Sequence, residues 1–591
     1  MEDVIFTCAI VAELTDGAFR RVAVHLAAAA FAFVLAFPIL AQTTFLPASE
    51  VKKGMRGTGR TVFSGNTVED FEVEILGTLE NLGPRQSLIL ARLSGGPLAQ
   101  TGVMQGMSGS PVYINGRLIG AVAMAFPFAK EPIAGIRPIE EMLQVEAPTR
   151  RAAAPLQNSP LGDSKLTEIA TPVSFRGFTS ETLAYFAPQL RALGLEPRQG
   201  VSGGGAGSNA ATASKLVPGS MISVQLVSGD LNVGADGTVT HIDGNRIFAF
   251  GHRFLATGET EMPFARAEVL TLLANVNTSF KISTSYEPLG TITQDRNTAV
   301  AGELGRKATM VPVQISVTGQ RKSDYKMEMV NDRFLSPFLL QMALYSAIDS
   351  SERMLGLSSF RLRGEIEFSS GAPAVRIDNL FAGEFGVPVA ASLAAATPLS
   401  FAMQSGPAFQ KIKSVKLRVE GSQTKTQWMV ERLHPVRNIV HPGEIAEMLV
   451  AFAGEDGAEQ VRRVQYQVPN GMSYGPLYFS VSDGPSTNAT EFKQWQGGAN
   501  GRTPAQVVSF LNGMRGNSSA WVRVWRADPG FQTQGEDLPA PPASMTLIFG
   551  RTPGALGGPV MARTTKLAEI EIPLGEAVVT GSRTAQVEIK E

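Results

Sequence analysis

The run from Thr101 to Pro111 constrains this fold most, because it places a serine between glycines in front of a short apolar hairpin. It reads TGVMQGMSGSP, and VYINGRLIGAV follows it. Glycine reaches backbone conformations that other residues avoid, so the glycines beside Ser108 allow a tight turn whose N–H groups converge. Asn115-Gly116 is a favoured two-residue hairpin turn. The pattern therefore predicts a turn-rich β protein with a strand pair directly after Ser108.

Ser108 is the candidate nucleophile of this turn, since chymotrypsin-like barrels present their serine in this way. The backbone amides of Gly106 and Ser108 are then the expected oxyanion donors. Ser110 is expected to pack or hydrogen-bond within the turn. The G-x-S-x-G elbow of α/β-hydrolases is absent, because Ser110 stands at its last glycine and strands follow instead of a helix. An ordinary Gly/Ser turn before a hairpin is the structural alternative.

A nucleophilic serine needs a general base, and His252 is the leading candidate among few histidines. It ends the run RIFAFGH, where an apolar strand stops at a glycine and delivers an imidazole to the sheet rim. A structural histidine with no chemical role is the alternative. The other histidines lie in the N-terminal apolar segment, beside a turn, or before prolines; they are His25, His241, His434 and His441.

Two blocks resemble the stage-IV sporulation protease (SpoIVB) peptidase family. Residues of about 90–145 carry the QGMSGSP run, the following hairpin and the motif IEEML. A second block, about 217–306, resembles the histidine region of the family and carries Gly251-His252, then GTIT and GELG. The resemblance implies a serine peptidase of chymotrypsin-like fold. By position, it assigns the nucleophile to Ser108 and the base to His252.

The chain departs from the family pattern in three ways. The family's aspartate falls on Leu93, which cannot orient an imidazole. The serine block precedes the histidine block, which indicates a permuted pair of barrels; a triad is defined by geometry and not by chain order. No peptide-binding PDZ-like module precedes the two blocks.

The third member of the site therefore stays open. The carboxylates near His252 in sequence, and a backbone carbonyl in their place, are the alternatives for orienting the imidazole. These carboxylates are Asp243, Glu259, Glu261 and Asp295.

Composition excludes several other classes of function. The 591 residues carry a net charge of −1, so a polyanion-binding footprint for nucleic acid is absent. Gly 60, Pro 36 and 44% hydrophobic residues suit a β protein. Cys8 is the single cysteine and leaves with the expected signal peptide, so we expect no disulfide. No motif indicates a metal, and the expected chemistry needs no cofactor.

The chain divides into five expected regions. Arg20-Arg21 and the apolar run after it predict an export signal, and membrane association is expected only if that segment stays uncleaved. Serial strands beyond residue 356 predict one or two β-sandwich modules. The regions are the signal peptide 1–41, the serine-bearing barrel half 45–150, a linker 151–215 with short helices and a Gly-rich loop, the histidine-bearing half with a helix 216–355, and the C-terminal β modules 356–591.

These observations predict an exported serine endopeptidase that acts on cell-envelope protein, with its own chain as one candidate substrate. The competing hypothesis is a non-catalytic envelope protein that retains the barrels and binds protein or glycan through its C-terminal modules. The sequence leaves the oligomeric state open.

Overall fold

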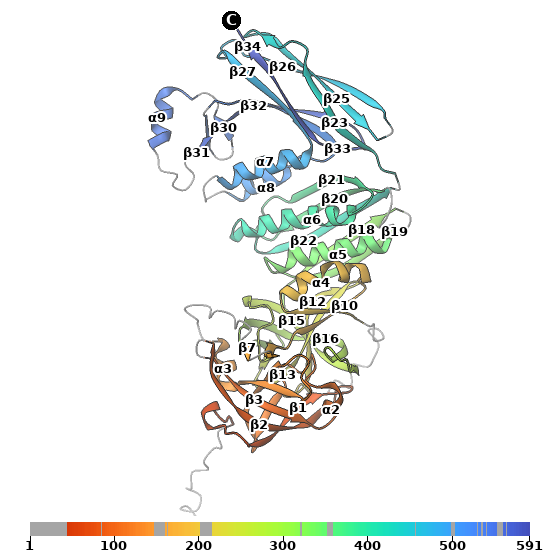
Figure 1. Ribbon diagram of the computed structural model, residues 1–591, viewed down its shortest axis with the longest axis vertical. Helices are drawn as coiled ribbons and strands as arrows, with labels where there is room; N and C mark the ends of the chain where they lie inside the picture. The colour runs from red at the N-terminus through yellow and green to blue at the C-terminus, as the bar shows by residue number, and fades with distance from the viewer. Residues whose placement is uncertain are drawn as a thin grey trace, which may run out of the picture.

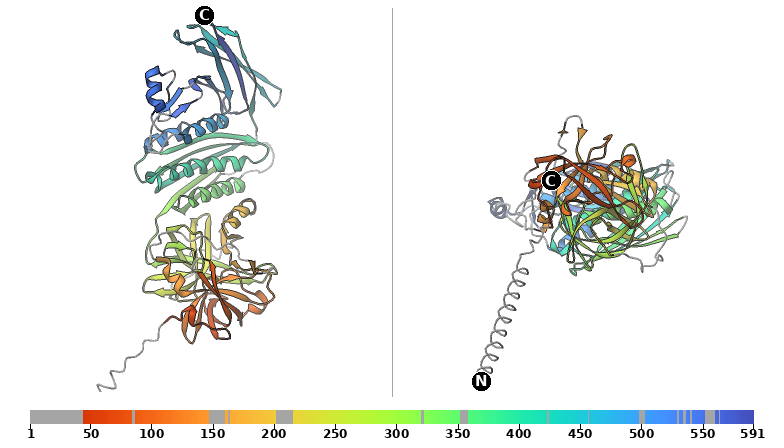
Figure 2. Two further views of the ribbon diagram at one scale, coloured as in Figure 1. Left: turned by 60° about the vertical axis from the view of Figure 1, so that its left-hand side comes forward. Right: turned by 90° about the horizontal axis from the view of Figure 1, so that it is seen from below.

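The computed structural model describes residues 44–83, 86–146, 160–161, 164–200, 215–319, 322–351, 358–422, 424–455, 457–497, 503–528, 530–533, 536–538, 541–551, 560–562 and 564–591. The expected signal segment 1–41, with Cys8 and His25, lies outside these residues. Parts of the expected linker, 151–159, 162–163 and 201–214, which include nearly all of its Gly-rich loop, lie outside them too. Along the long axis, two barrels, a middle α/β layer and a sandwich follow one another (Figures 1 and 2).

The serine-bearing half is a closed β-barrel. Its strands are ordered β4-β1-β2-β3-β6-β5, and pairing of β4 with β5 closes the ring. Asn115 and Gly116 join β4 to β5 with positive φ angles of 51° and 76°, as a type I′ turn requires. The strands are β1 (Arg56–Val62), β2 (Val68–Gly83), β3 (Gln86–Ser94), β4 (Pro111–Ile114), β5 (Arg117–Ala125) and β6 (Ile133–Pro138).

The histidine-bearing half is a second closed barrel. Its strands run β13-β14-β17-β16-β15-β12, and β12 also pairs with β13. The mainly β architecture with a double barrel, expected from the sequence, is therefore confirmed. The strands are β12 (Met221–Gly229), β13 (Asn232–Asp243), β14 (Arg246–Ala249), β15 (Gly258–Leu273), β16 (Phe280–Arg296) and β17 (Ala299–Leu304).

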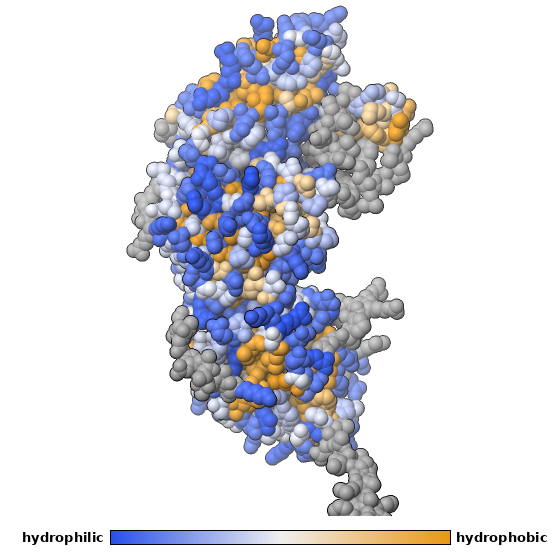
Figure 3. All heavy atoms as spheres, turned by 180° about the vertical axis from the view of Figure 1, so that it is seen from behind, coloured by the Kyte–Doolittle hydropathy of each residue, from blue (hydrophilic) through white to orange (hydrophobic). Residues whose placement is uncertain are grey.

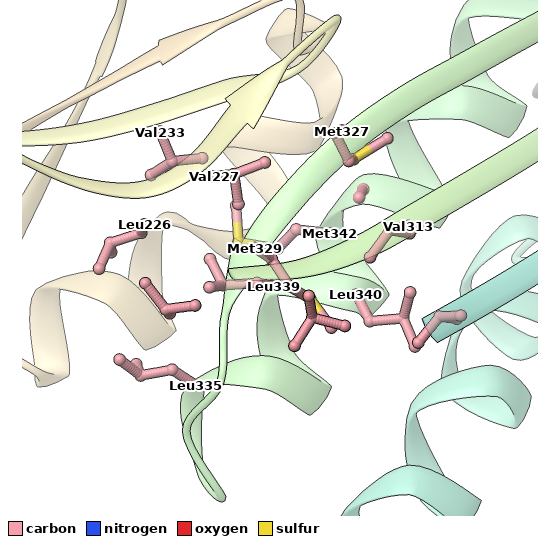
Figure 4. Close-up of a cluster of buried hydrophobic side chains, with 14 of the residues drawn as sticks. Leu226, Val227, Val233, Val313, Met327, Met329, Leu335, Leu339, Leu340 and Met342 are labelled. Atoms are coloured by element: carbon pink, nitrogen blue, oxygen red, sulfur yellow. The ribbon is translucent and has the colours of Figure 1, made fainter. Parts of the chain in front are cut away.

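The second barrel continues into a middle α/β layer without a break in the sheet. Strand β12 pairs with β19, and the sheet goes on through β18, β22, β20 and β21. Side chains of β12, β13, β18, β19 and helix α5 form one buried apolar cluster (Figure 4). The elements of this layer are β18 (Met310–Thr318), β19 (Lys322–Val330), α5 (Leu335–Ser351), β20 (Ser358–Phe368), β21 (Val375–Gly383), α6 (Val387–Gln404) and β22 (Ile412–Ser422).

This layer corrects the expected start of the C-terminal β modules at residue 356. Strands β20 to β22 alternate like sandwich strands, but they pair with β18 and bury one face under helices. Period-two alternation reports only that one face is buried and not which element buries it, so the sequence could not separate the two cases.

The sandwich comprises two sheets, β26-β25-β23-β33 and β24-β34-β27-β28-β32, around a shared core. Helices α7 (Gly484–Gly497) and α8 (Pro504–Asn512) lie between the sandwich and the middle layer (Figure 1). The sandwich strands are β23 (Gln427–Pro435), β24 (Ile439–Val440), β25 (Ile445–Gly454), β26 (Glu459–Gln467), β27 (Gly475–Ser482), β28 (Ser519–Arg526), β32 (Thr565–Pro573), β33 (Val578–Thr580) and β34 (Ser582–Ile589).

One described helix, α6, is long and apolar enough to cross a membrane by length and composition. Half of it is buried, however, and it packs against α5, β20 and β21 as a core helix does. On the face shown in Figure 3, apolar residues form separate patches among polar ones over the barrels, the middle layer and the sandwich. Scattered apolar surface of this kind is ordinary for a folded chain.

Candidate active site

The turn that carries Ser108 connects the short helix α2 (Leu98–Thr101) to β4. Gly106 and Gly109 take φ angles of +91° and +93°, which a side chain would disfavour. The Gly109 N–H donates to the Val122 carbonyl at 2.8 Å, which ties the turn to β5. The glycines thus have the role in the turn that their spacing predicted.

Strand β13 of the second barrel hydrogen-bonds to this turn. The Thr238 N–H donates to the Ser108 carbonyl at 2.9 Å, and the Thr238 hydroxyl donates to the Gly106 carbonyl at 2.9 Å. The Thr240 hydroxyl donates to the Gly109 carbonyl at 2.7 Å. Alternate residues of one strand face therefore hold three carbonyls of the serine turn.

Two amides of the turn remain without an acceptor in the described part of the chain. The N–H groups of Gln105, Met107, Gly109 and Ser110 all donate to backbone carbonyls. Among the described residues, those of Gly106 and Ser108 donate to none. Free amides two residues apart beside a serine are the arrangement that stabilises a tetrahedral oxyanion.

His252 follows β14 at a sharp change of chain direction. Phe250 and Gly251 both have positive φ, 72° and 70°, and the Phe250 N–H donates to the Thr238 carbonyl at 3.2 Å. Thr238 therefore bonds both to Ser108 and to the residue two positions before His252. The serine turn and the segment before His252, which are far apart in the sequence, therefore both hydrogen-bond to the backbone of Thr238.

The His252 ring is buried and lies in the tautomer that a general base needs. Its Nδ1 lies 2.6 Å from the Arg253 carbonyl oxygen. A carbonyl can only accept, so Nδ1 carries the hydrogen and Nε2 keeps its lone pair. Burial lowers the pKa of His252 below its ordinary 6.5, and the negative charge of Glu168 opposes that shift. The imidazole is therefore neutral at pH 7.

The two candidate reacting atoms are not hydrogen-bonded to each other. His252 Nε2 and Ser108 Oγ are both buried, and neither has a hydrogen-bond partner among the described residues. Ser110 Oγ is also buried without a partner there. Catalytic hydrogen bonds often form only once substrate is bound.

Asp295 is the one candidate acid that contacts the loop after His252. Its carboxylate accepts hydrogen bonds from the N–H groups of Phe254 at 2.8 Å, Leu255 at 2.8 Å and Thr257 at 3.2 Å. Burial raises the pKa of Asp295, and these amide donors oppose the shift. Among the described residues, the carboxylate makes no hydrogen bond to the imidazole; it fixes the loop that presents the Arg253 carbonyl.

The other three candidate acids are engaged elsewhere. Asp243 pairs with Arg246 at 2.5 Å on the turn between β13 and β14. Glu261 accepts from the Thr309 N–H at 3.3 Å, and Glu259 lies opposite Gln294 in the β15–β16 ladder. Leu93, at the family's aspartate position, is buried in the core of the first barrel.

Two charged residues near His252 escaped the sequence reasoning. Arg137 of β6 is fully buried and donates to the Gly251 carbonyl at 3.4 Å, while it pairs with Glu141 at 3.2 Å. Glu168 pairs with Arg253 at 3.3 Å. Neither residue has a sequence motif. What marks Arg137 is its burial, and the sequence alone does not show that an arginine is buried.

The described residues include no group of three or more His, Cys, Asp or Glu side chains placed to hold a metal ion. No curated protein matches the chain. Residues 41–143 match the family model described as SpoIVB peptidase S55. This range contains the serine turn and all strands of the first barrel. The serine-bearing barrel of this chain is thus similar to the SpoIVB peptidase family over residues 41–143.

Proposed function

We propose that the chain is an exported serine endopeptidase that cleaves cell-envelope protein, its own chain being one candidate substrate, with Ser108 as nucleophile and His252 as general base. The observation that carries the proposal is the serine turn with free amides at Gly106 and Ser108, held by the strand that also positions the His252 segment. The family match of residues 41–143 supports the same reaction class.

In the proposed reaction, His252 Nε2 accepts the proton of Ser108 Oγ, and the oxygen attacks the scissile carbonyl carbon. The Gly106 and Ser108 amides stabilise the oxyanion. The imidazolium then gives its proton to the leaving amine, and water hydrolyses the acyl-enzyme by the reverse path. Asp295 acts through the loop that it fixes and not on the ring itself.

The burial of both reacting atoms has a consequence for access. Ser108 is 0% and His252 2% exposed, so a polypeptide reaches them only after neighbouring side chains move. The same two observations, burial and the unformed Ser–His hydrogen bond, favour the second candidate function, a non-catalytic binding protein. In that case the C-terminal sandwich provides the working surface.

Labelling with a fluorophosphonate probe decides between the two functions. We expect labelling of the full chain, loss in Ser108→Ala, strong slowing in His252→Gln, and retention in Ser110→Ala. Ser110 is the matched control because it is equally buried and lies two residues away. Failure of the unchanged chain to label, or equal labelling of both serine variants, contradicts the peptidase proposal.

A further inference from the structure

Arg198 lies beside the proposed oxyanion turn and is held in place there. It belongs to β11 (Leu195–Gln199), the strand at one end of the long sheet. Its Nη2 donates to Gln105 Oε1 at 3.3 Å, and Gln105 directly precedes Gly106. Its guanidinium lies 3.9 Å from the centre of the Phe280 ring. The contact with the Phe280 ring and the hydrogen bond to the Gln105 side chain together fix the plane of the guanidinium.

The backbone of Gln105 is equally well fixed. Its N–H donates to the Ser279 carbonyl at 2.9 Å, and its carbonyl accepts from the Lys281 N–H at 3.3 Å. The backbone of Gln105 is therefore hydrogen-bonded to the residues on both sides of Phe280, and Gly106 follows Gln105 directly. The hydrogen bond to Gln105 and the contact with Phe280 thus hold the Arg198 guanidinium beside a fixed segment of backbone.

Arg198 has no carboxylate partner among the described residues. The nearest acidic residue on its own strand, Glu196, is already bound at both oxygens by Arg191, at 3.0 and 3.1 Å. Arg198 Nε is buried and has no hydrogen-bond partner there. Burial lowers the pKa of Arg198, which reports a partly desolvated cation. A desolvated cation with an unused N–H gains strongly from a carboxylate.

A buried lysine of the second barrel packs along the same turn. A Cβ atom at Gly106 would lie 3.1 Å from Lys281 Cδ, so the lysine stem runs along the turn. Lys281 Nζ donates to the Thr61 hydroxyl at 2.8 Å, and the acid that faces Lys281 from β13 is Asp236. The Asp236 carboxylate accepts hydrogen bonds from the Ser174 and Ser283 hydroxyls, and no hydrogen bond joins it to Arg198 among the described residues.

We propose that Arg198 is a specificity residue that binds a carboxylate of the substrate peptide next to the scissile bond. The inference rests on the proposed peptidase function. The Gln105 side chain that holds the guanidinium belongs to the residue directly before Gly106, so a carboxylate of a peptide bound at this turn can pair with the cation. The carboxylate comes either from an Asp or Glu side chain or from the free C-terminus of a peptide.

Peptide binding to the full-length Ser108→Ala chain tests this inference without any bond cleavage. The probes are fluorescein-labelled, C-terminally amidated heptapeptide pools with Glu, Gln or Lys fixed at the centre and the other positions randomised. We expect the Glu pool to bind about 10- to 100-fold more tightly than the Gln pool, the factor that hydrogen bonds to a charged group supply. A Gln pool with a free C-terminus separates the two carboxylate sources.

Substitutions assign the preference to Arg198. Arg198→Gln should abolish it, and Arg198→Glu should turn it toward the Lys pool. Arg176→Gln is the matched control, because Arg176 is a half-buried arginine on the neighbouring strand β10 (Thr171–Arg176) that bonds to Ser285 instead of Gln105. Equal binding of the Glu and Gln pools, or a preference that survives in Arg198→Gln, overturns the inference. Since Ser108 is absent from this assay, the result is independent of the labelling test for the peptidase.

Discussion

At the scale of single residues, a main-chain carbonyl contacts the His252 ring where a triad would have an acid, in the site that we propose. The imidazole is oriented by the Arg253 carbonyl, and Asp295 holds the loop that carries that carbonyl through three backbone amides. A buried carboxylate that satisfies several amides is a rigid anchor. By position, the family's aspartate falls on Leu93 in the core of the first barrel, whereas the Arg253 carbonyl that contacts the ring belongs to the second barrel.

Asp295→Asn tests this arrangement through a pH profile. The amide keeps one acceptor but loses the charge that raises the pKa of His252. We expect the fluorophosphonate labelling rate to fall about 10- to 100-fold, because a loosened loop misplaces the base. In the unchanged chain the rate should rise with pH to a plateau, with a midpoint below 6.5 because burial lowers that pKa. In the variant the midpoint should move lower still.

Asp243→Asn is the control for this charge change. Asp243 lies on the same barrel, but it pairs with Arg246 at the surface. Its variant should keep both the rate and the midpoint. An Asp295→Asn protein that labels at the unchanged rate with an unchanged midpoint would show that something else orients the imidazole.

At the scale of elements, the contact between the serine turn and strand β13 is the critical one. Gly109 lies so close to that strand that a Cβ atom would stand 2.0 Å from the Thr238 carbonyl oxygen and 2.5 Å from the Phe250 nitrogen. Both atoms belong to the backbone, so neither can move aside alone. The glycine is therefore required for the approach of the two barrels as well as for its own φ.

Gly109→Ala should separate the serine turn from β13. We expect a loss of about 2–4 kcal/mol in the stability of the barrels, from strain and overpacking together. Labelling of Ser108 should fall with it. Hydrogen–deuterium exchange of peptides from β13 and from the serine turn measures the loss locally.

Gly116→Ala is the matched control for the backbone conformation. Gly116 also has positive φ, +76°, but a Cβ atom there meets nothing within 4 Å. Its substitution should cost only the left-handed strain, about 1–2 kcal/mol, and should leave the labelling rate unchanged. Equal effects of the two substitutions would mean that the contact with β13 does not matter.

The sequence predicted those parts of the fold and site that depend on local pattern. Glycine spacing predicted the Ser108 turn, and Asn115-Gly116 predicted the hairpin because a type I′ turn needs two residues of positive φ. The sequence could not predict the contact of Asp295 with the loop after His252. That contact depends on the register of β15 against β16, which contains several bulges. A bulge shifts every following side chain, and periodicity does not reveal its position.

At the scale of the whole molecule, the two barrels depend on each other through buried polar groups. Lys281 of the second barrel donates from Nζ to Thr61 in β1 of the first, at 2.8 Å. Burial lowers the pKa of Lys281 to about 7, and the charges of Asp236 and Glu69 oppose the shift. Burial raises the pKa of Asp236 to about 6. The stability of the barrel pair must therefore vary with pH.

The sign follows from proton counts in the two states. Between pH about 7 and 10.5, the lysine is mostly neutral in the folded chain and protonated in the unfolded one. The unfolded state then binds more protons, so stability rises with pH across this window. The slope approaches about 1.4 kcal/mol per pH unit for one fully coupled group. Asp236 acts in a separate window, from pH 3.8 to about 6, where stability falls as pH rises.

Lys281→Met should flatten the alkaline rise, because methionine fills much of the same volume without a titrating group. Tryptophan fluorescence is unsuited to this measurement, since all 4 tryptophans lie beyond residue 427 and report mainly on the sandwich and its adjoining helices. Hydrogen–deuterium exchange of β1 and β16 peptides at several pH values, corrected for intrinsic exchange, reports on the barrels. Lys322→Met removes an exposed lysine, 71% accessible, and should keep the full slope. A slope that survives in Lys281→Met would place the titrating group elsewhere in the barrel interface.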